Sequence, residues 1–223
     1  MNDLEFLEQD DARGVRLQLE YLEAESLLRK HGVRHTILVM GSTRVSRRNP
    51  YYRVAREFGG IVGRARRAAI MTGGGPGIME AANRGALEAG GLSIGLNIEL
   101  PSAQRPNRYT TPELALRFRY FALRKLHFLL RARAMVAFPG GFGTFDELFE
   151  TLTLVQTRKI KPLPVVLVGE AYWRRAADMD YLRSEGMIGA ADAKLFCYAE
   201  SARDIWNAIR DWYRRAGKEV FPD

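Results

Sequence analysis

Two glycine-rich turns are the segments of this sequence best suited to hold a substrate. They are Thr72-Gly-Gly-Gly-Pro-Gly77 and Pro139-Gly-Gly-Phe-Gly-Thr144, and each joins a predicted strand to a predicted helix. Glycine lets the backbone approach a ligand closely, and the free N–H groups and dipole of a helix start attract phosphate. Glycines can instead serve only to make tight turns. Because two such loops fall at the same edge of the predicted sheet, we predict a phosphate-binding site there.

Motifs that are typical of several other enzyme classes are absent from the sequence. Neither loop fits G-x-G-x-x-G, and G-x-x-x-x-G-K-[ST] does not occur, so redox chemistry on a dinucleotide and P-loop hydrolysis lose support. His31, His35 and His127 lack metal-ligand spacing, which disfavours a zinc or di-metal hydrolase. No G-x-S-x-G elbow supports an esterase. We therefore predict neither a metal nor a cofactor.

A carboxylate follows the second loop by one helical turn. Thr144-Phe-Asp-Glu147 fits the S/T-x-x-E capping box, in which Glu147 accepts a hydrogen bond from the backbone N–H of Thr144. A carboxylate one turn from a phosphate cradle is also placed to act on the sugar that carries the phosphate. The spacing alone does not separate the structural role from the catalytic one.

Arg124 and Lys125 are the cations best placed to reach this site. They belong to a predicted helix that leads directly into the strand before the second loop. The same segment holds four further cations, which are Arg117, Arg119, Arg131 and Arg133. We expect Arg131 and Arg133 to lie on a solvated helix face. For Arg124 and Lys125, the charge pattern leaves a site role and a surface role equally open.

Strands and helices alternate around these loops. Short apolar runs without polar alternation predict buried parallel strands over 36–40, 68–71, 92–98, 134–138, 164–169 and 195–198. The stretches between them predict helices over 51–67, 78–89, 121–133, 146–157, 172–183 and 202–215. Another helix is expected over 11–30, before the sheet begins.

This alternation predicts an α/β fold, a Rossmann-like doubly wound parallel sheet in a single domain with an extra N-terminal helix. We assign residues 1–34 to the N-terminal helical extension and 35–223 to the Rossmann-like nucleotide-binding domain. Ligands of such sheets bind at the carboxyl ends of the strands. The predicted phosphate-binding residues at that edge are Ser42, Gly73, Gly74, Gly75, Gly77, Gly140, Gly141, Phe142, Gly143 and Thr144.

Composition fits one ordinary globular domain of 223 residues, 47% hydrophobic and 27% charged. Cys197 is alone, which excludes an intramolecular disulfide and fits a reducing compartment. The longest aliphatic run, Val165 to Val168, is far shorter than the ~20 residues of a membrane span. The acidic N-terminus, whose first basic residue is Arg13, is unlike a signal peptide. We therefore expect a cytoplasmic protein with no membrane partner.

The formal charge of +8, from 34 basic and 26 acidic residues, is compatible with an anionic partner, but by itself it fits arginines that solvate helix faces better. The basic residues are scattered among acidic ones and form no run with interleaved aromatics, so we expect no nucleic-acid partner. A small phosphorylated ligand fits this pattern better.

Together these residues resemble a known family. Pro139-Gly-Gly-Phe-Gly-Thr-Phe-Asp-Glu147 matches P-G-G-x-G-T-x-x-E, with Arg124-Lys125 upstream and Gly73-Gly-Gly-Pro-Gly-Ile-Met-Glu80 before them, as in the Lonely Guy family of cytokinin-activating phosphoribohydrolases. The resemblance covers about residues 36–183. It implies hydrolysis of a nucleoside 5'-monophosphate at its N-glycosidic bond, giving free base and ribose 5-phosphate.

By this resemblance the catalytic pair falls on Arg124 and Glu147. Further substrate-binding positions fall on Glu80, Lys125, the loop from Gly141 to Glu147, and Thr153. The N-terminal helix and the stretch after the motif resemble the longer bacterial branch, which implies a homodimer or a hexamer of dimers. Some relatives carry a lysine decarboxylase label, but the sequence contains no pyridoxal phosphate motif that supports it.

The resulting hypothesis is an N-glycosyl hydrolase acting on cytokinin or adenine nucleotides. The 5'-phosphate would be held by the N–H groups of Gly141 to Thr144 with help from the Gly73 to Gly77 loop, and its binding energy would orient the ribose. Glu147 would stabilise the oxocarbenium charge and activate water. Arg124 would either neutralise the phosphate or aid departure of the base. The alternative is a non-catalytic nucleotide or cofactor carrier that uses the same loops.

Overall fold

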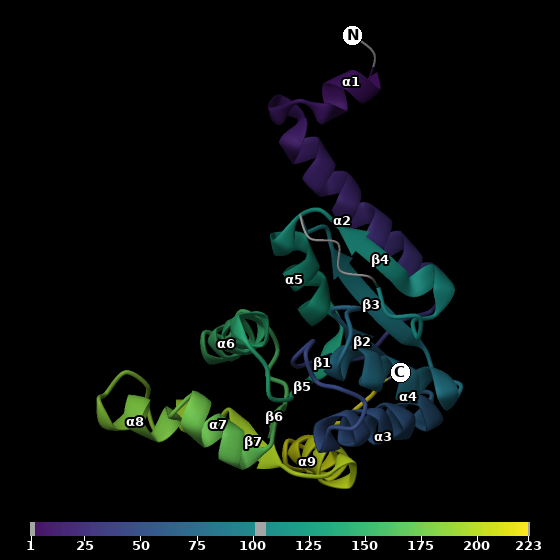
Figure 1. The fold of residues 1–223 in the computed structure, drawn as a ribbon. Coiled ribbons are helices and arrows are strands. Elements are labelled where there is room, and N and C mark those ends of the chain that lie inside the picture. The colour runs from purple at the N-terminus through teal and green to yellow at the C-terminus, as the bar shows by residue number, and fades with distance from the viewer. Residues whose placement is uncertain (1–2, 101–105, 223) are drawn as a thin grey trace.

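One parallel sheet organises the molecule. The computed structural model describes residues 3–100 and 106–222, and within them seven strands lie in the order β4-β3-β2-β1-β5-β6-β7 (Figure 1). The strands are β1 (Thr36–Met40), β2 (Ala69–Thr72), β3 (Ser93–Ile98), β4 (Ala115–Phe118), β5 (Ala132–Ala137), β6 (Val165–Val168) and β7 (Phe196–Ala199). All of the strand pairs are parallel. The predicted fold class is therefore confirmed.

Helices cover both faces of the sheet. The helices are α1 (Asp3–Glu8), α2 (Arg13–Lys30), α3 (Pro50–Ala65), α4 (Ile78–Glu88), α5 (Phe121–Leu130), α6 (Phe142–Gln156), α7 (Glu170–Ala176), α8 (Met179–Ser184) and α9 (Ala202–Arg215). Short 3-10 turns lie at Asp10–Ala12, Pro112–Leu114 and Asp192–Lys194. Among the described residues, none of these helices is long and apolar enough to cross a membrane.

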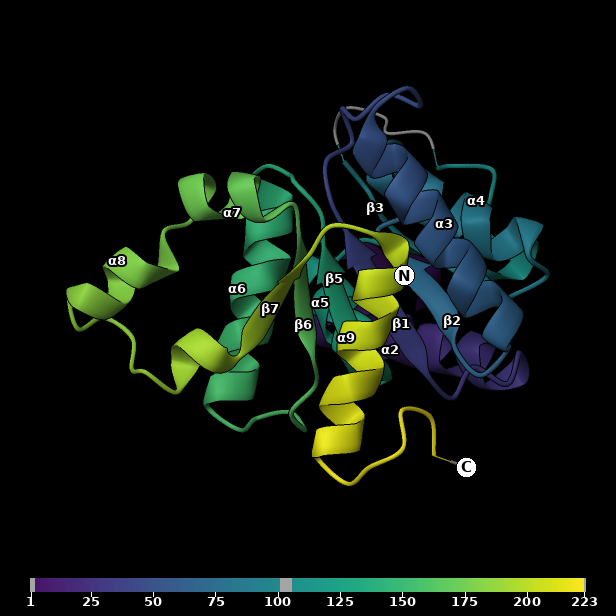
Figure 2. The same ribbon diagram turned by 90° about the horizontal axis from the view of Figure 1, so that it is seen from below.

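The two faces of the sheet bury separate cores. Side chains alternate along β1, where Ile37 and Val39 enter one core and Leu38 and Met40 enter the other. The first core lies under α3, α4 and α9, and the second lies under α2, α5, α6 and α7 (Figure 2). Strands buried on both faces read as continuous apolar runs, which is why the sequence pattern finds them.

The strand order reverses direction next to β1. The chain builds β1 to β4 towards one side, then returns to place β5 on the other side of β1. Loops that follow β1 and β5 therefore diverge from a common point, where doubly wound sheets bind their ligands. Ser42 follows β1 and Pro139 follows β5, so two of the predicted loops meet at this point.

Some predicted boundaries are wrong. The helix expected over 121–133 ends at Leu130, and the one expected over 172–183 is two short helices, α7 and α8. β4 was not predicted, because its residues alternate between exposed and buried, as an edge strand does, instead of forming an apolar run.

The N-terminal helices lie partly off the sheet. α1 and the first half of α2 project away from the body, whereas Ala24 and Leu28 of α2 join the core (Figure 1). The predicted division of the chain between residues 34 and 35 stays a prediction.

Candidate functional site

Three loops interlock at the carboxyl ends of β1, β2 and β5. The backbone N–H of Ser42 donates to the carbonyl of Pro139 at 3.0 Å, and the carbonyl of Ser42 accepts from the N–H of Ile78 at 3.1 Å. Gly77 has a φ of +70°, and a Cβ there would clash with the Ser42 carbonyl, so only glycine permits this approach. The structure thus brings Ser42 and both predicted glycine loops together.

A buried polar network holds the first glycine loop. The hydroxyl of Thr72 donates to Oδ1 of Asn83 at 2.6 Å and accepts from the N–H of Gly74 at 2.9 Å. Asn107 donates through Nδ2 to the carbonyl of Gly75 and to Oδ1 of Asn83, both at 3.0 Å. Asn83 is fully buried. These side chains fix the path of the loop, and the glycine motif gives no sign of them.

The second loop ends at the start of α6. The helix begins at Phe142, with Gly141 as its N-cap and no side-chain cap. The predicted capping box at Thr144 is therefore wrong, because Thr144 already lies inside the helix. The first N–H groups of a helix have no partner within it, so those of Phe142, Gly143 and Thr144 remain available to an anion. Phe142 itself is 97% exposed.

Glu147 lies one turn into α6 on its buried face. It is 7% exposed, and a Cβ on Gly143 would lie 3.9 Å from its Oε2. Burial raises the pKa of Glu147 to about 7, against the opposing charge of Arg124. A carboxyl with such a pKa is able to gain or lose a proton near neutral pH.

Arg124 of α5 is the second buried ionisable group of the site, at 8% exposed. Its Nε donates to the carbonyl of Leu96 at 2.8 Å, and its guanidinium lies 5.0 Å from the ring centre of Phe128. A Cβ on Gly73 would clash with its Nη2. Burial lowers the pKa of Arg124, opposed by the charge of Glu147. The guanidinium is therefore fixed against the first glycine loop, within electrostatic range of Glu147.

Lys125 joins the helices that carry this pair. Its Nζ lies 3.0 Å from Oδ1 of Asp146 and 3.3 Å from Oε2 of Glu150, so it links α5 to α6. Although burial opposes the effect, hydrogen bonds and charges from these two acids raise the pKa of Lys125. In this structure Lys125 positions the helices of Arg124 and Glu147.

Glu80 lies in the first turn of α4, after the first glycine loop. Its Oε1 accepts hydrogen bonds from Nε of Arg47 at 3.0 Å and from the hydroxyl of Tyr52 at 2.8 Å. Arg47 and Tyr52 also line a groove of about 780 Å³ over α3 and α4. The sequence patterns gave no reason to single out these two partners.

Thr153 does not join the cluster. It is exposed, and its hydroxyl donates to the carbonyl of Phe149 at 2.7 Å. Its neighbour Thr151 is buried on the same face as Glu147 and donates to the Glu147 carbonyl at 2.7 Å. Of the larger apolar side chains close in sequence to the site residues, Met79 and Phe118 are core residues, whereas Phe121 is 51% exposed.

The expected solvated roles of Arg131 and Arg133 are wrong. Arg131 makes a bidentate pair with Glu25 at 2.5 and 2.9 Å. Arg133 donates to the carbonyls of Glu219 and Val220 and lies 4.7 Å from the ring centre of Tyr213. Neither residue lies on a helix face, because α5 ends before Arg131 and Arg133 belongs to β5. Both side chains instead attach other segments of the chain to the sheet.

Comparison with known proteins gives a family match and several relatives. A family model described as "Possible lysine decarboxylase" matches residues 79–209. A probable cytokinin riboside 5'-monophosphate phosphoribohydrolase of Oryza sativa subsp. japonica is 27% identical over 179 residues, 79% of this chain and 76% of the relative. A cytokinin riboside 5'-monophosphate phosphoribohydrolase of Arabidopsis thaliana is 29% identical over 96 residues, 43% of this chain and 45% of the relative.

Solved structures share the fold. The molybdenum cofactor carrier protein of Chlamydomonas reinhardtii superposes with a TM-score of 0.58 at 24% identity, covering 80% of this chain and 97% of that one. The molybdenum cofactor binding protein of Rippkaea orientalis gives 0.55 at 22% identity, covering 80% and 97%. At these identities the likeness supports the architecture alone.

The family description raises the question of a lysine decarboxylase cofactor. Pyridoxal phosphate is held as a Schiff base, which requires a lysine able to lose its proton. Lys125, the lysine of the candidate site, is paired with Asp146 and Glu150, and its pKa is raised. The residues of the site therefore do not fit this cofactor.

Proposed function

The chain belongs to the protein family described as possible lysine decarboxylase, and from that premise we propose that it hydrolyses the N-glycosidic bond of nucleoside 5'-monophosphates. The predicted resemblance to the Lonely Guy family is confirmed, because curated cytokinin riboside 5'-monophosphate phosphoribohydrolases match the chain. Adenine and cytokinin nucleotides are the proposed substrates, and free base and ribose 5-phosphate are the proposed products.

The observation that carries this proposal is a buried carboxyl beside a phosphate-type helix start. Glu147 lies one turn below the free N–H groups of Phe142 to Thr144 and has a pKa of about 7. A 5'-phosphate at those N–H groups would direct the ribose towards Glu147. Arg124, which lies against the first glycine loop, is close enough to Glu147 for their charges to interact.

The proposed reaction is a hydrolysis at the anomeric carbon. The bond between C1' and the base nitrogen breaks, the base accepts a proton, and water supplies the new C1'–O bond. Ionised Glu147 stabilises the developing oxocarbenium charge and accepts the proton of the attacking water. The fixed Arg124 guanidinium provides positive charge for the phosphate or for the departing base.

Substitution of Glu147 tests this assignment. With AMP as substrate, we expect Glu147→Gln to lower kcat by about 10²-fold or more, because a general base contributes about 10²–10⁴. Glu185→Gln is the matched control. It changes an exposed carboxylate just after α8, outside the candidate site, and should retain activity. Near wild-type release of adenine by folded Glu147→Gln would contradict the proposal.

The second candidate function is a non-catalytic nucleotide or cofactor carrier. The shared fold with molybdenum cofactor carrier and binding proteins favours it. A carrier would bind AMP and return it unchanged, and Glu147→Gln would leave that binding intact. The buried pair of Arg124 and Glu147 favours the enzyme, because a carboxyl with a pKa near 7 is suited to general acid or base catalysis.

We also propose that the chain self-associates, as a homodimer or a hexamer of dimers in the cytoplasm. Large apolar side chains are exposed on two helices that contact each other, Leu19 and Leu22 on α2 and Leu126 and Leu130 on α5. Exposed apolar clusters of this kind commonly mark interfaces. Light scattering on the purified protein should give a mass of at least two chains, and a monomer would contradict this proposal.

A further inference from the structure

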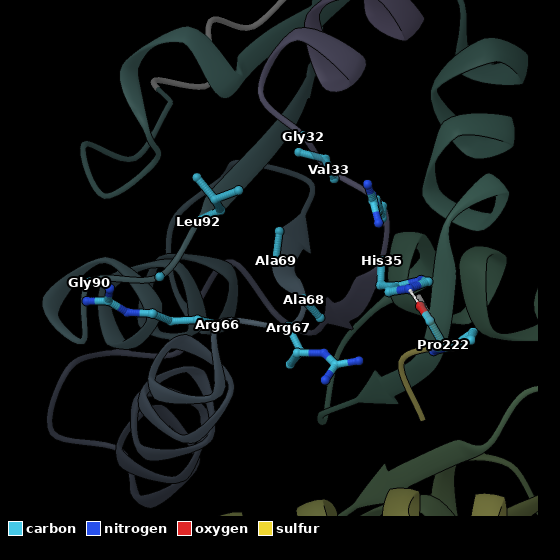
Figure 3. Close-up of a pocket in the computed structure, with 12 residues that line it drawn as sticks. Gly32, Val33, His35, Arg66, Arg67, Ala68, Ala69, Gly90, Leu92 and Pro222 are labelled. Atoms are coloured by element: carbon cyan, nitrogen blue, oxygen red, sulfur yellow. Dashed lines mark hydrogen bonds between the residues drawn. The ribbon is translucent and has the colours of Figure 1, made fainter. Parts of the chain in front are cut away.

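A cavity of about 350 Å³ lies at the opposite edge of the sheet from the candidate site (Figure 3). It is formed by the turns that enter β1, β2 and β3, at residues 32–35, 66–69 and 90–92, and Pro222 lies at its rim. These turns are at the amino ends of the strands, whereas the glycine loops are at the carboxyl ends. The cavity is therefore separate from the site assigned to nucleotide hydrolysis.

Arginine side chains dominate the lining of this cavity. Arg34, Arg66 and Arg67 line it together with His35, and none of the described residues that line it is an aspartate or a glutamate. The side chains of Arg34 and Arg66 make no hydrogen bond or ion pair with residues 3–100 and 106–222. Arg67 donates to the carbonyl of Phe221 at 2.7 Å, and Nε2 of His35 lies 2.7 Å from the carbonyl of Pro222. Two guanidinium groups at this cavity thus have no partner within the described chain.

The backbone at Arg66 adopts an unfavourable conformation. Arg66 has a φ of 51° and ends α3 in the left-handed region, where glycine is the usual residue. A Cβ on Gly90 would lie 3.2 Å from Nη2 of Arg66, so the guanidinium lies over Gly90 at the cavity (Figure 3). Strained backbone often marks a functional site. A glycine at position 66 would relieve the strain but remove the charge.

We propose that this cavity is a second binding site, for a small phosphate monoester. Arginine forks suit phosphate oxygens, and the two guanidinium groups of Arg34 and Arg66, which have no partner within residues 3–100 and 106–222, favour a dianion. Val33, Leu92 and Pro222 supply apolar surface for the body of the ligand. The volume lies within the range of about 300–1,000 Å³ that is typical of small-molecule sites.

Backbone NMR of the full chain tests this site with two probes, inorganic phosphate and phenyl phosphate. We expect saturable shifts of the amide signals of Gly32, Gly90 and Gly91 with both probes, and tighter binding of phenyl phosphate. Benzoate, a carboxylate of similar body, should bind at least tenfold more weakly. Because each amide reports its own location, binding at Gly141 to Thr144 is measured separately.

Two substitutions form a matched pair. Arg66→Gly should weaken phenyl phosphate binding at this cavity at least tenfold and leave the protein folded, because glycine adopts positive φ without strain. Arg158→Gly is the control, since Arg158 also has a positive φ, 57°, just after α6, but does not line the cavity. It should leave the binding unchanged.

The proposal is overturned if the Gly32, Gly90 and Gly91 amides do not shift at millimolar probe. It is also overturned if Arg66→Gly and Arg158→Gly affect binding equally, or if benzoate binds as tightly as phenyl phosphate. Failure here leaves AMP hydrolysis untouched, because the two sites lie at opposite edges of the sheet.

Discussion

The guanidinium of Arg124 lies directly against the backbone of Gly73, with no room for a Cβ between them. This contact joins α5 to the first glycine loop and fixes the cation at the edge where β1, β2 and β5 end. It explains why a residue without a side chain follows β2, although the backbone there does not have a positive φ.

Gly73→Ala should therefore impair activity more than folding. The added Cβ would clash with Nη2 of Arg124 and lie 2.9 Å from Sδ of Met79, so both side chains would have to shift from their present positions. We expect a stability loss of about 1–2 kcal/mol, typical of mild overpacking, and a fall of at least about tenfold in kcat/KM as Arg124 shifts. AMP hydrolysis and urea unfolding measure the two effects.

Gly14→Ala is the control for that substitution. Gly14 lies in α2, and a Cβ there would meet nothing within 4 Å. Activity should stay at the wild-type level, and stability should rise by up to about 1 kcal/mol from helix propensity. Equal losses of activity in both variants would show that the contact with Arg124 is irrelevant.

The raised pKa of Glu147 should be visible in the pH dependence of stability. Burial raises its pKa from 4.5 to about 7. The folded protein therefore binds a proton more tightly than the unfolded chain, so this group favours folding below pH 4.5, and that contribution is lost as the pH rises through about 7. At about 1.4 kcal/mol per unit, the loss is about 3 kcal/mol.

Glu147→Gln should remove this loss. Urea unfolding at pH 5 and pH 8 is expected to show the variant more stable than the wild type at pH 8, with a smaller difference at pH 5. The wild-type rate of AMP hydrolysis should rise with pH through about 7, because the general base must be ionised. A stability profile identical in both proteins would rule out the raised pKa.

The sequence patterns predict the sheet better than the surroundings of Glu147. β1, β2, β5 and β6 are short apolar runs, and each of them is followed by a glycine within three residues, so their order along the chain and the ligand edge follow. The sequence predicts that this helix begins at residue 146, four residues after the observed start of α6 at Phe142, because Gly141 and Gly143 are poor helix formers. Because α6 begins at Phe142, Glu147 lies inside the helix and does not cap its start, so its carboxyl is free for chemistry.

Removing the Thr72 hydroxyl should loosen the first glycine loop. Thr72→Val keeps the shape of the side chain but loses its bonds to Asn83 and to the N–H of Gly74. We expect a loss of about 1–3 kcal/mol from the unsatisfied partners, and a KM for AMP that rises more than kcat falls, because the proposed substrate site includes this loop.

Thr36→Val is the matched control in β1. The buried hydroxyl of Thr36 has no hydrogen-bond partner among the described residues, so its removal should be neutral or stabilising and leave KM unchanged. If Thr72→Val and Thr36→Val gave the same stability and KM, the network would have no role in the loop.

The buried pair of Glu25 and Arg131 should anchor α2 to the sheet. Hydrogen bonds from Arg131 lower the pKa of Glu25, against the effect of burial. Glu25→Gln is expected to cost about 1.5–3 kcal/mol, because it weakens the hydrogen bonds to the partly buried guanidinium of Arg131. Asp10→Asn, which breaks the exposed pair with Arg13, should cost less than about 1 kcal/mol. Thermal unfolding compares them, and equal losses would contradict the anchor.

Long-range contacts of this kind are what the sequence patterns do not reveal. Arg131 lies 106 residues from Glu25, and Asn107 lies 24 residues from Asn83, so neither pairing follows from local spacing. Burial of Arg124 and Glu147 likewise depends on the packing of α5 and α6 against the sheet. The motif names the catalytic candidates, but their pKa values come from the fold.

Product analysis after incubation with AMP and with adenosine tests the central proposal most directly. We predict equal amounts of adenine and ribose 5-phosphate from AMP, and little adenine from adenosine, because the 5'-phosphate orients the ribose. GMP, CMP and isopentenyl-AMP, assayed in parallel, would define the base preference. Binding of these nucleotides with no release of base from any of them would contradict the account and favour a carrier.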